Sequence, residues 1–187
     1  QAGILIKNAD ALERFERVDT LVVDKTGTLT EGKPKLTKIV AVPGLPEDEL
    51  LALAASLERA SEHPLAAAIV GAAAARGIGL VDVQAVESIT GKGIRGQVGA
   101  RAVMLGTRTF LQEAGIAADA FGAEADALRG DGATVMFVAI DEAMAGLVAV
   151  ADPVKASTRA AIAALREAGL RIVMVTGDNR LTAEAIG

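Results

Sequence analysis

The chain has 187 residues, a formal net charge of −5 and four aromatic residues, all of them phenylalanine. The absence of cysteine excludes disulfides and thiolate metal sites, and a single histidine, His63, excludes a histidine-based zinc site. The acidic balance, without a basic cluster, predicts no nucleic-acid surface. The longest nearly uniform apolar run, residues 66–75, is shorter than the roughly 20 residues of a membrane-spanning helix, so we expect no direct membrane contact.

The predicted elements begin with an apolar strand over residues 4–6 and a helix over residues 9–15 that Asn8 can cap. A second apolar strand, residues 21–23, delivers Asp24 into a turn rich in hydroxyl groups. An open α/β sheet presents reactive groups in this way, at the carboxyl end of a strand. Asp24 is therefore a candidate nucleophile.

The residues around Asp24 favour phosphoryl transfer. A carboxylate can attack phosphorus and form an acyl phosphate, although its charge repels the incoming phosphate. Such a site needs a cation such as Lys25, a metal ion, and hydroxyl groups such as those of Thr26 and Thr28. Gly27 lets the backbone turn its N–H groups inward. The alternative is a solvated turn that closes a strand, because Asp, Thr and Gly are ordinary turn residues.

Residues 27–34 nearly fit the spacing of a phosphate-binding P-loop. The last place of that motif needs a Ser or Thr to hold magnesium, but here it is Pro34, which has no hydroxyl. The following residues, 35–42, alternate between polar and apolar and predict a half-buried strand, whereas a P-loop runs into a helix. We therefore reject the P-loop interpretation.

Two helices are predicted next, over residues 47–59 and 64–76. Pro46 opens the first, which has an acidic first turn, and Gly77 ends the second. His63 stands just before the second helix. From the residues alone, a histidine beside a proline is ordinarily a helix-entry residue without chemistry, and this interpretation is the alternative to a functional histidine.

A glycine-rich stretch, residues 91–96, connects strands predicted over residues 81–86 and 94–104. It fits the GxGxxG dinucleotide fingerprint literally, but that motif must open a helix. Here the following residues predict a hairpin that turns near Gly99-Ala100, so we reject the dinucleotide interpretation. A plain glycine-rich hairpin is the alternative to a functional loop.

After this stretch the pattern changes twice. Two helices are predicted over residues 108–114 and 117–129. They are followed by a hairpin of two strands, residues 133–140 and 145–150, which predicts an antiparallel sheet. From Asp152 on, a helix over residues 155–168 and a strand over residues 171–175 predict parallel α/β structure. An antiparallel domain inserted into a parallel one explains both changes.

The last strand delivers Thr176-Gly177-Asp178 into the start of another predicted helix. The free N–H groups of a helix start, behind a hydroxyl and a glycine, form an anion site that can receive a phosphate bound to Asp24. Asp178 also suits a plain helix N-cap. Two loops of this kind, each after an apolar strand, predict one shared site.

The string DKTGTLT, from Asp24 to Thr30, resembles the phosphorylation loop of the P-type ATPases, cation pumps whose phosphorylation domain has the haloacid dehalogenase class of fold. In that family a Thr-Gly-Asp turn joins this loop, and an Asp-Pro pair, here Asp152-Pro153, marks a hinge. The resemblance implies that ATP phosphorylates Asp24, with Mg²⁺ bound at Asp24 and Thr26. The implied catalytic residues are Asp24, Lys25, Thr26, Thr176, Gly177 and Asp178.

The string Ser61-Glu62-His63-Pro64 resembles the nucleotide-domain signature of the heavy-metal branch of these pumps. In that branch the histidine helps to orient ATP, and a glutamate that matches Glu58 contacts the adenine region. The family commonly has asparagine where this chain has Thr107. The implied nucleotide-binding residues are Glu58, His63, Gly91, Gly93, Ile94 and Gly106.

The resemblance implies an α/β phosphorylation domain of the haloacid dehalogenase class, residues 1–33 and 151–187, truncated at its C-terminal end. An α+β nucleotide-binding domain built on an antiparallel sheet, residues 34–150, is inserted into it. The implied partners are ATP and the transmembrane and actuator domains of the same parent chain, at the cytoplasmic face of a membrane. We expect the 187-residue chain itself to be monomeric.

The chain ends at Gly187 within a helical pattern, before the later lysine and the Gly-Asp-Gly-x-Asn-Asp loop of the family. We therefore expect it to bind nucleotide but to phosphorylate poorly. Residues 4–13 and 152–155 resemble copper exporters more than zinc or cadmium pumps, which implies Cu⁺ as the cargo. One alternative is a soluble haloacid dehalogenase-type phosphatase, which would carry an aspartate where this chain has Thr26. The other is a non-catalytic nucleotide-binding module.

Overall fold

In the computed structural model, which describes residues 16–176, the backbone divides into two units that we take one at a time. The smaller unit contains residues 16–31 and 154–176, and the larger contains residues 32–153. The predicted elements at residues 4–6 and 9–15, together with Gly177 and Asp178, lie outside the described residues. Within residues 16–176, no helix has the length and apolar character needed to cross a bilayer.

The smaller unit is built on two parallel strands, β1 (Thr20–Asp24) and β8 (Arg171–Val175), whose ends are paired as Asp24 opposite Val175. Both strands were predicted from their apolar runs. A turn, η1 (Lys25–Leu29), follows β1, and α6 (Thr158–Glu167) precedes and packs against β8.

Helix α6 starts three residues later than residue 155, the start predicted from Pro153. The reason is a tertiary contact. Val154 forms an isolated antiparallel bridge with Thr30, and the Lys155 N–H donates to the Leu29 carbonyl at 3.0 Å. These bonds keep the chain out of the helix until Thr158. The predicted end is confirmed, because Gly169 takes a left-handed φ of 85° just after the helix.

The larger unit contains a six-stranded sheet in the order β2-β7-β6-β5-β4-β3, with every neighbouring pair antiparallel. Its strands are β2 (Lys35–Ala41), β3 (Val83–Ile89), β4 (Gly93–Val98), β5 (Arg101–Gly106), β6 (Thr134–Ile140) and β7 (Ala143–Ala151). The antiparallel sheet and its hairpin turns at residues 99–100 and 141–142 confirm the prediction.

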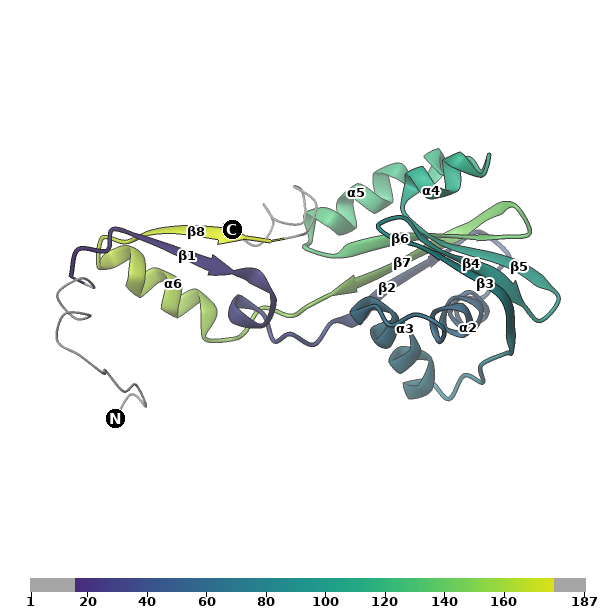
Figure 1. Cartoon of the computed structure of the whole chain (residues 1–187), viewed down its shortest axis with the longest axis horizontal. Helices are drawn as coiled ribbons and strands as arrows, with labels where there is room; N and C mark the ends of the chain where they lie inside the picture. Colours follow the sequence, from purple (N-terminus) through teal and green to yellow (C-terminus); the bar gives the residue numbers. More distant parts are fainter. Residues whose placement is uncertain (1–15, 177–187) are drawn as a thin grey trace. The chain divides into compact units, whose positions relative to one another are not determined.

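Helices cover both faces of this sheet (Figure 1). Helices α2 (Glu47–Glu58) and α3 (Pro64–Ala75) bury Leu50, Leu57 and Ile69 against one face. Helix α4 (Arg108–Glu113), the short η2 (Asp119–Phe121) and α5 (Gly122–Gly130) close the other face around Phe110, Leu111 and Phe137. Because both faces are covered, β6 is apolar without alternation and is buried from Val135 to Ile140.

In the larger unit, two predicted elements also differ from the structure. Strand β3 begins at Val83 and reaches Ile89, whereas the apolar pattern predicted residues 81–86. A bulge between Gln84 and Glu87, with Ala85 at a φ of 49°, interrupts the alternation on which the prediction depended. The single helix predicted over residues 117–129 is divided into η2 and α5, and α5 begins at Gly122.

Candidate functional site

Asp24 is the last residue of β1, and its side chain is exposed. A tight turn follows, with Thr26 and Gly27 as its two central residues. The backbone angles of Thr26 (φ −75°, ψ 123°) and Gly27 (φ 75°, ψ −14°) are those of a type II turn. The second central place of that turn requires a positive φ, which glycine adopts without strain. Backbone geometry therefore explains why the DKTGTLT string has a glycine at position 27.

Hydrogen bonds within the turn converge on Thr30, which is fully buried. Its hydroxyl accepts from the Gly27 N–H at 3.1 Å and donates to the Lys25 carbonyl at 3.1 Å. Its own N–H donates to the same carbonyl at 3.2 Å. Sequence reasoning singled out Thr26 and Thr28 as the useful hydroxyls and missed Thr30, although it belongs to the same string.

Two further residues that sequence reasoning did not place in the site contact this turn: Lys155, which precedes α6, and Thr158, the first residue of α6. The Lys155 ammonium donates to the Gly27 carbonyl at 2.6 Å, and the Thr158 hydroxyl donates to the Leu29 carbonyl at 2.7 Å. The only sequence signal for either was the position of Lys155 shortly after the Asp-Pro pair.

The structure brings two of the predicted catalytic segments to one edge of the sheet. Because β1 and β8 are parallel and end together, Thr176 leaves the sheet beside the residues that follow Asp24. Thr26 is exposed in the turn, whereas Lys25 is only 6% exposed. Gly177 and Asp178 lie outside the described residues, so this edge is described up to Thr176.

In the larger unit, Glu58 is the last residue of α2 and is 5% exposed. Its Oε2 atom is buried and has no hydrogen-bond partner in the described structure. Burial raises the pKa of the Glu58 carboxyl above its ordinary value of 4.5, and a hydrogen bond from Ser61 opposes that rise. A buried acceptor without a partner is costly unless a ligand completes it.

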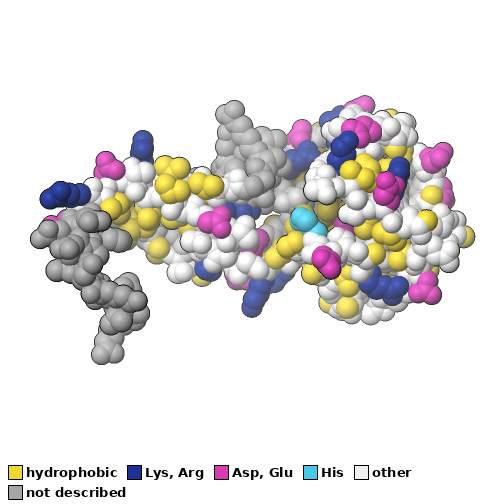
Figure 2. All heavy atoms as spheres, in the orientation of Figure 1, with side chains coloured by type: hydrophobic (Ala, Val, Ile, Leu, Met, Phe, Trp, Pro, Cys, Tyr) yellow, Lys and Arg dark blue, Asp and Glu magenta, His cyan; other side chains and the backbone are white. Residues whose placement is uncertain are grey.

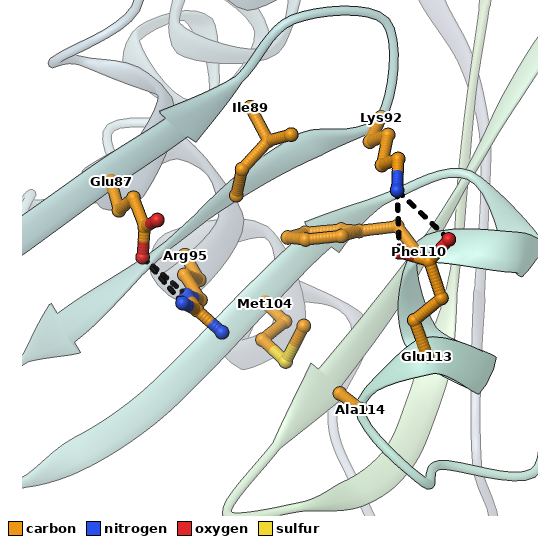
Figure 3. Close-up of a pocket in the computed structure, with 8 residues that line it drawn as sticks. All are labelled: Glu87, Ile89, Lys92, Arg95, Met104, Phe110, Glu113 and Ala114. Atoms are coloured by element: carbon orange, nitrogen blue, oxygen red, sulfur yellow. Dashed lines mark hydrogen bonds and ion pairs between the residues drawn. The ribbon is translucent and has the colours of Figure 1, made fainter.

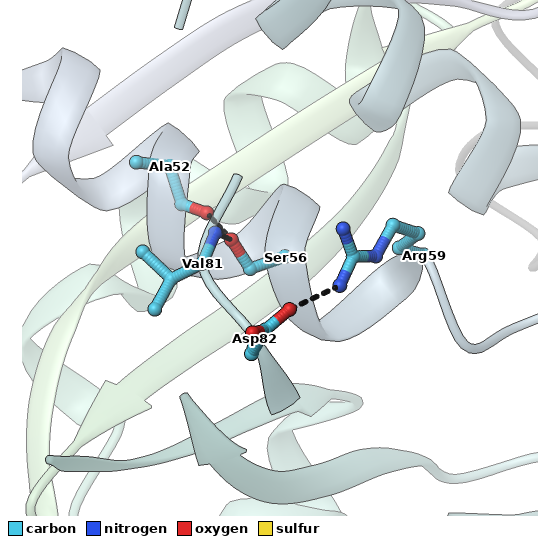
Figure 4. A network of polar contacts seen from close by, with 5 residues as sticks. All are labelled: Ala52, Ser56, Arg59, Val81 and Asp82. Atoms are coloured by element: carbon cyan, nitrogen blue, oxygen red, sulfur yellow. Dashed lines mark hydrogen bonds and ion pairs between the residues drawn. The ribbon is translucent and has the colours of Figure 1, made fainter. Parts of the chain in front are cut away.

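A polar network fixes the end of α2 that carries Glu58 (Figure 4). The buried Ser56 hydroxyl donates to the Ala52 carbonyl at 2.6 Å and accepts from the Val81 N–H at 2.9 Å. One turn further on, Arg59 pairs with Asp82 at 3.4 Å. The last turn of α2 is thereby tied to the segment that enters β3.

His63 is the N-cap of α3, and its side chain is exposed. Figure 2 shows the histidine, coloured cyan, on the face in view. Its Nδ1 accepts a hydrogen bond from the Leu65 N–H at 3.2 Å, so the neutral ring carries its proton on Nε2. The residue therefore caps a helix and also keeps a free ring position for a ligand.

The predicted glycines differ in their surroundings. Gly91 has a φ of 73°, and nothing lies within 4 Å of the place where its side chain would stand. Gly93 and Gly106 are paired across β4 and β5, and there the ring of Phe110 and the neighbouring backbone fill that space. Of these three glycines, Gly91 alone therefore presents open backbone.

Ile94 and Thr107, the two other residues of this region, have structural roles. Ile94 is 3% exposed and belongs to the core under α2 and α3. The Thr107 hydroxyl accepts from the Phe110 N–H at 3.2 Å and caps α4. A threonine that caps a helix explains how this chain accommodates its departure from asparagine.

A pocket of about 280 Å³ lies on the side of the sheet that α4 covers (Figure 3). Ile89, Met104 and Phe110 supply its apolar lining, and ion pairs between Lys92 and Glu113 and between Arg95 and Glu87 flank it. None of the predicted nucleotide-binding residues lines this pocket. The Lys92–Glu113 pair instead ties the Gly91–Gly93 turn to α4.

Residues 18–187 match the family of haloacid dehalogenase-like hydrolases. A copper-transporting P-type ATPase from Rhizobium leguminosarum bv. viciae is 58% identical over 184 residues, which cover 98% of this chain and 22% of that relative. The chain therefore spans less than a quarter of the length of this relative.

Two solved structures of ATPases are similar to this chain in three dimensions. A zinc-transporting PIB-type ATPase in the E2.Pi state is similar with a TM-score of 0.78 and 37% identity, over 97% of this chain and 29% of that one. The catalytic domain of the CPx-ATPase CopB-B, whose conformation changes upon nucleotide binding, is similar with a TM-score of 0.67 and 26% identity, over 96% of this chain and 62% of that one. The chain belongs to the haloacid dehalogenase-like hydrolases, and its sequence and fold are similar to parts of heavy-metal P-type ATPases.

Proposed function

We propose that the chain is the ATP-binding and phosphorylation region of a heavy-metal-transporting P-type ATPase. The observation that carries the proposal is the placement of Asp24. It stands exposed at the carboxyl end of β1, beside the end of β8 and Thr176, in a turn held by its own hydrogen bonds. The similarity to P-type ATPases over nearly the whole chain supports it.

Residues 1–33 and 151–187 would form the phosphorylation domain, and residues 34–150 the nucleotide-binding domain. The contacts divide the chain near these boundaries, after Glu31 and after Pro153. The rest of the parent protein would supply the transmembrane and actuator domains, with this region on the cytoplasmic side.

In the larger unit, ATP would bind near Glu58, His63 and Gly91. The partnerless Oε2 of Glu58 can accept a hydrogen bond from the amino group of adenine, and the Nε2–H of His63 can donate to the nucleotide. Gly91 lets the nucleotide approach the backbone closely. Gly93 and Gly106 contribute by allowing the packing that shapes the turn, and Ile94 contributes as a core residue.

In the reaction, a carboxylate oxygen of Asp24 attacks the γ-phosphorus of ATP. A new O–P bond forms, the bond from that phosphorus to the bridging oxygen breaks, and ADP leaves with the electron pair. Lys25 contributes positive charge to the loop, while Thr176, Gly177 and Asp178 would receive the phosphate at the neighbouring strand end. Because Thr26 replaces the acid that a phosphatase uses, the aspartyl phosphate persists and can drive ion transport.

The donor set around Asp24 suits Mg²⁺. Among residues 16–176 there is no cluster of three or more His, Cys, Asp or Glu that could hold a metal by itself. Mg²⁺ binds through one or two carboxylates together with phosphate oxygens and water, and Asp24 is an exposed carboxylate at the end of β1. Asp24 and Thr26 would hold the ion, and the ion would neutralise charge on the phosphate.

Calorimetric titration with a non-hydrolysable ATP analogue tests the nucleotide site. We expect His63→Asn to weaken binding and Asp24→Asn to leave it nearly unchanged, because the two residues serve different steps. Glu62→Gln, an exposed change next to His63, is the control. Binding that depends on residues 27–33 instead of His63 would contradict the proposal and restore the P-loop interpretation.

Cu⁺ is the cargo that we propose, because the copper-transporting relative is 58% identical and the zinc-transporting structure is 37% identical. The test is ATP hydrolysis by the full-length parent protein. We expect stimulation by Cu⁺ and not by Zn²⁺, and the reverse result would overturn this assignment.

A further inference from the structure

Lys155 contacts the Asp24 turn through both its side chain and its backbone. Its ammonium donates to the Gly27 carbonyl at 2.6 Å, and its N–H donates to the Leu29 carbonyl at 3.0 Å. The Thr158 hydroxyl reaches the same Leu29 carbonyl at 2.7 Å. The segment that leads into α6 thus binds two carbonyl oxygens of the turn.

These contacts set the direction of individual peptide planes. In a planar trans peptide, the C=O of one residue and the N–H of the next point in opposite directions. When Lys155 holds the Gly27 oxygen, the Thr28 N–H must face away from Lys155. The preceding peptide is fixed separately, because the Gly27 N–H donates to the Thr30 hydroxyl.

A partner outside the turn is needed to fix the direction of the Gly27 carbonyl, because glycine can adopt many backbone angles. The Gly27 φ of 75° is accessible to glycine along with many other angles, so the residue does not choose between orientations of its carbonyl. An ammonium group on a carbonyl is a charge-assisted hydrogen bond, about twice as strong as a neutral one. It selects one orientation.

We propose that Lys155 is a positioning residue for the phosphoryl-acceptor turn, an inference that rests on the proposed function. A carbonyl oxygen that turned toward the incoming phosphate would repel it, whereas Lys155 keeps the Gly27 oxygen directed toward its own ammonium group. The turn is therefore preorganised before ATP arrives and needs no rearrangement during transfer.

Amide hydrogen exchange on the ligand-free 187-residue chain tests the conformational part. Lys155→Met should speed exchange of the amides of residues 27–30 by about tenfold, the factor expected when about 1.4 kcal/mol of hydrogen bonding is lost. Lys155→Arg keeps a cationic donor and should restore most of the protection. Lys38→Met, which removes an exposed lysine from β2, is the matched control and should leave the turn unchanged.

Binding of beryllium fluoride with Mg²⁺ to the full-length parent protein, followed by ¹⁹F NMR, tests the functional part, because this complex imitates a phosphoryl group on a carboxylate. We expect Lys155→Met to weaken binding by about tenfold, Lys155→Arg to recover it and Asp24→Asn to abolish it.

The two measurements separate the possible failures. Unchanged exchange in Lys155→Met would overturn the inference, and so would faster exchange with unchanged beryllium fluoride affinity, which would make Lys155 purely structural. If the unsubstituted parent protein bound no beryllium fluoride, the acceptor role of Asp24 would fail and the positioning role would fail with it. Exchange would then still decide whether Lys155 fixes the turn.

Discussion

Gly93 and Gly106 stand opposite each other on β4 and β5, and the ring of Phe110 lies against both. A β-carbon on Gly93 would collide with the Leu105 carbonyl and come within 2.7 Å of the Gly106 Cα. Because backbone atoms cannot move aside, we expect Gly93→Ala to lower the free energy of unfolding by about 2 kcal/mol or more. Urea denaturation measures this loss.

Gly91→Ala is the matched substitution two residues earlier. Nothing lies near its β-carbon position, so only the strained φ of 73° opposes it, at roughly 1 kcal/mol. We expect this variant to fold and to lose affinity for nucleotide. Equal stability of Gly93→Ala and the unsubstituted chain would show that our account of the packing is wrong.

Two substitutions of His63 separate its structural and ligand-binding roles. His63→Ala removes the acceptor for the Leu65 N–H and should cost about 1 kcal/mol of stability. His63→Asn keeps a good N-cap and should stay close to the original stability while nucleotide binding falls. Thermal unfolding and calorimetric titration of the same samples measure the two properties. If His63→Asn bound ATP normally, histidine would serve only as a cap.

The buried carboxyl of Glu58 makes stability depend on pH. Burial raises its pKa in the folded state above the ordinary 4.5, so the folded chain binds this proton more tightly than the unfolded chain. The contribution of Glu58 to stability therefore falls as the pH rises from about 4.5 through the raised pKa. Above the raised pKa the ionised group is destabilising.

We accordingly expect Glu58→Gln to be more stable than the unsubstituted chain at pH 7, by on the order of 1 kcal/mol, with the difference shrinking toward pH 4.5. The same change should weaken ATP binding about tenfold, since it replaces one of the two carboxyl oxygens with an amide nitrogen that cannot accept a hydrogen bond. Urea denaturation across this pH range measures the first effect. Glu62→Gln, at an exposed site, should show neither, and a pH-independent difference for Glu58→Gln would contradict the assignment.

Two residues without glycine's freedom have positive φ angles in the turn between β6 and β7, and a substitution can relieve the resulting backbone strain. Asp141 and Glu142 have φ angles of 49° and 64°, as a type I′ turn requires. Hydrogen bonds from Arg101 and from the Ala102 N–H lower the pKa of Asp141 and hold it in place, but glycine would suit position 142 better. We expect Glu142→Gly to raise the free energy of unfolding by roughly 0.5–1 kcal/mol in urea denaturation. Glu142→Ala keeps the strain and should give no such gain.

Elements whose signals are local could be predicted from the sequence. The apolar runs of β1 and β8, the Pro64 entry of α3 and the turn at residues 99–100 all follow from neighbouring residues, and the structure confirms them. The predicted bounds were wrong where a contact with a residue distant in sequence, or a bulge, determines where an element begins or ends. The start of α6 depends on the bridge from Thr30 to Val154, and β3 depends on a bulge that hides its alternation.

The site shows the same division. Asp24 was found because its string is continuous in sequence, whereas Lys155 reaches Gly27 across a separation of 128 residues, which no spacing rule indicates. The partnerless oxygen of Glu58 is likewise a property of packing, because nothing in the residue type says that its carboxyl will be buried. The roles assigned to these residues in nucleotide binding and phosphorylation stay predictions.

The neighbouring positions of β2 and β7, with Lys35 opposite Ala151, have a consequence for protein engineering. The first and last strands of the larger unit lie one ladder apart, about 5 Å. A unit with such adjacent ends is portable, since it can be transplanted into a surface loop of another protein without spreading that loop. A short linker could equally join these two strands, and the chain could be reopened at the turn of residues 141–142 as a circular permutant with its sheet order intact.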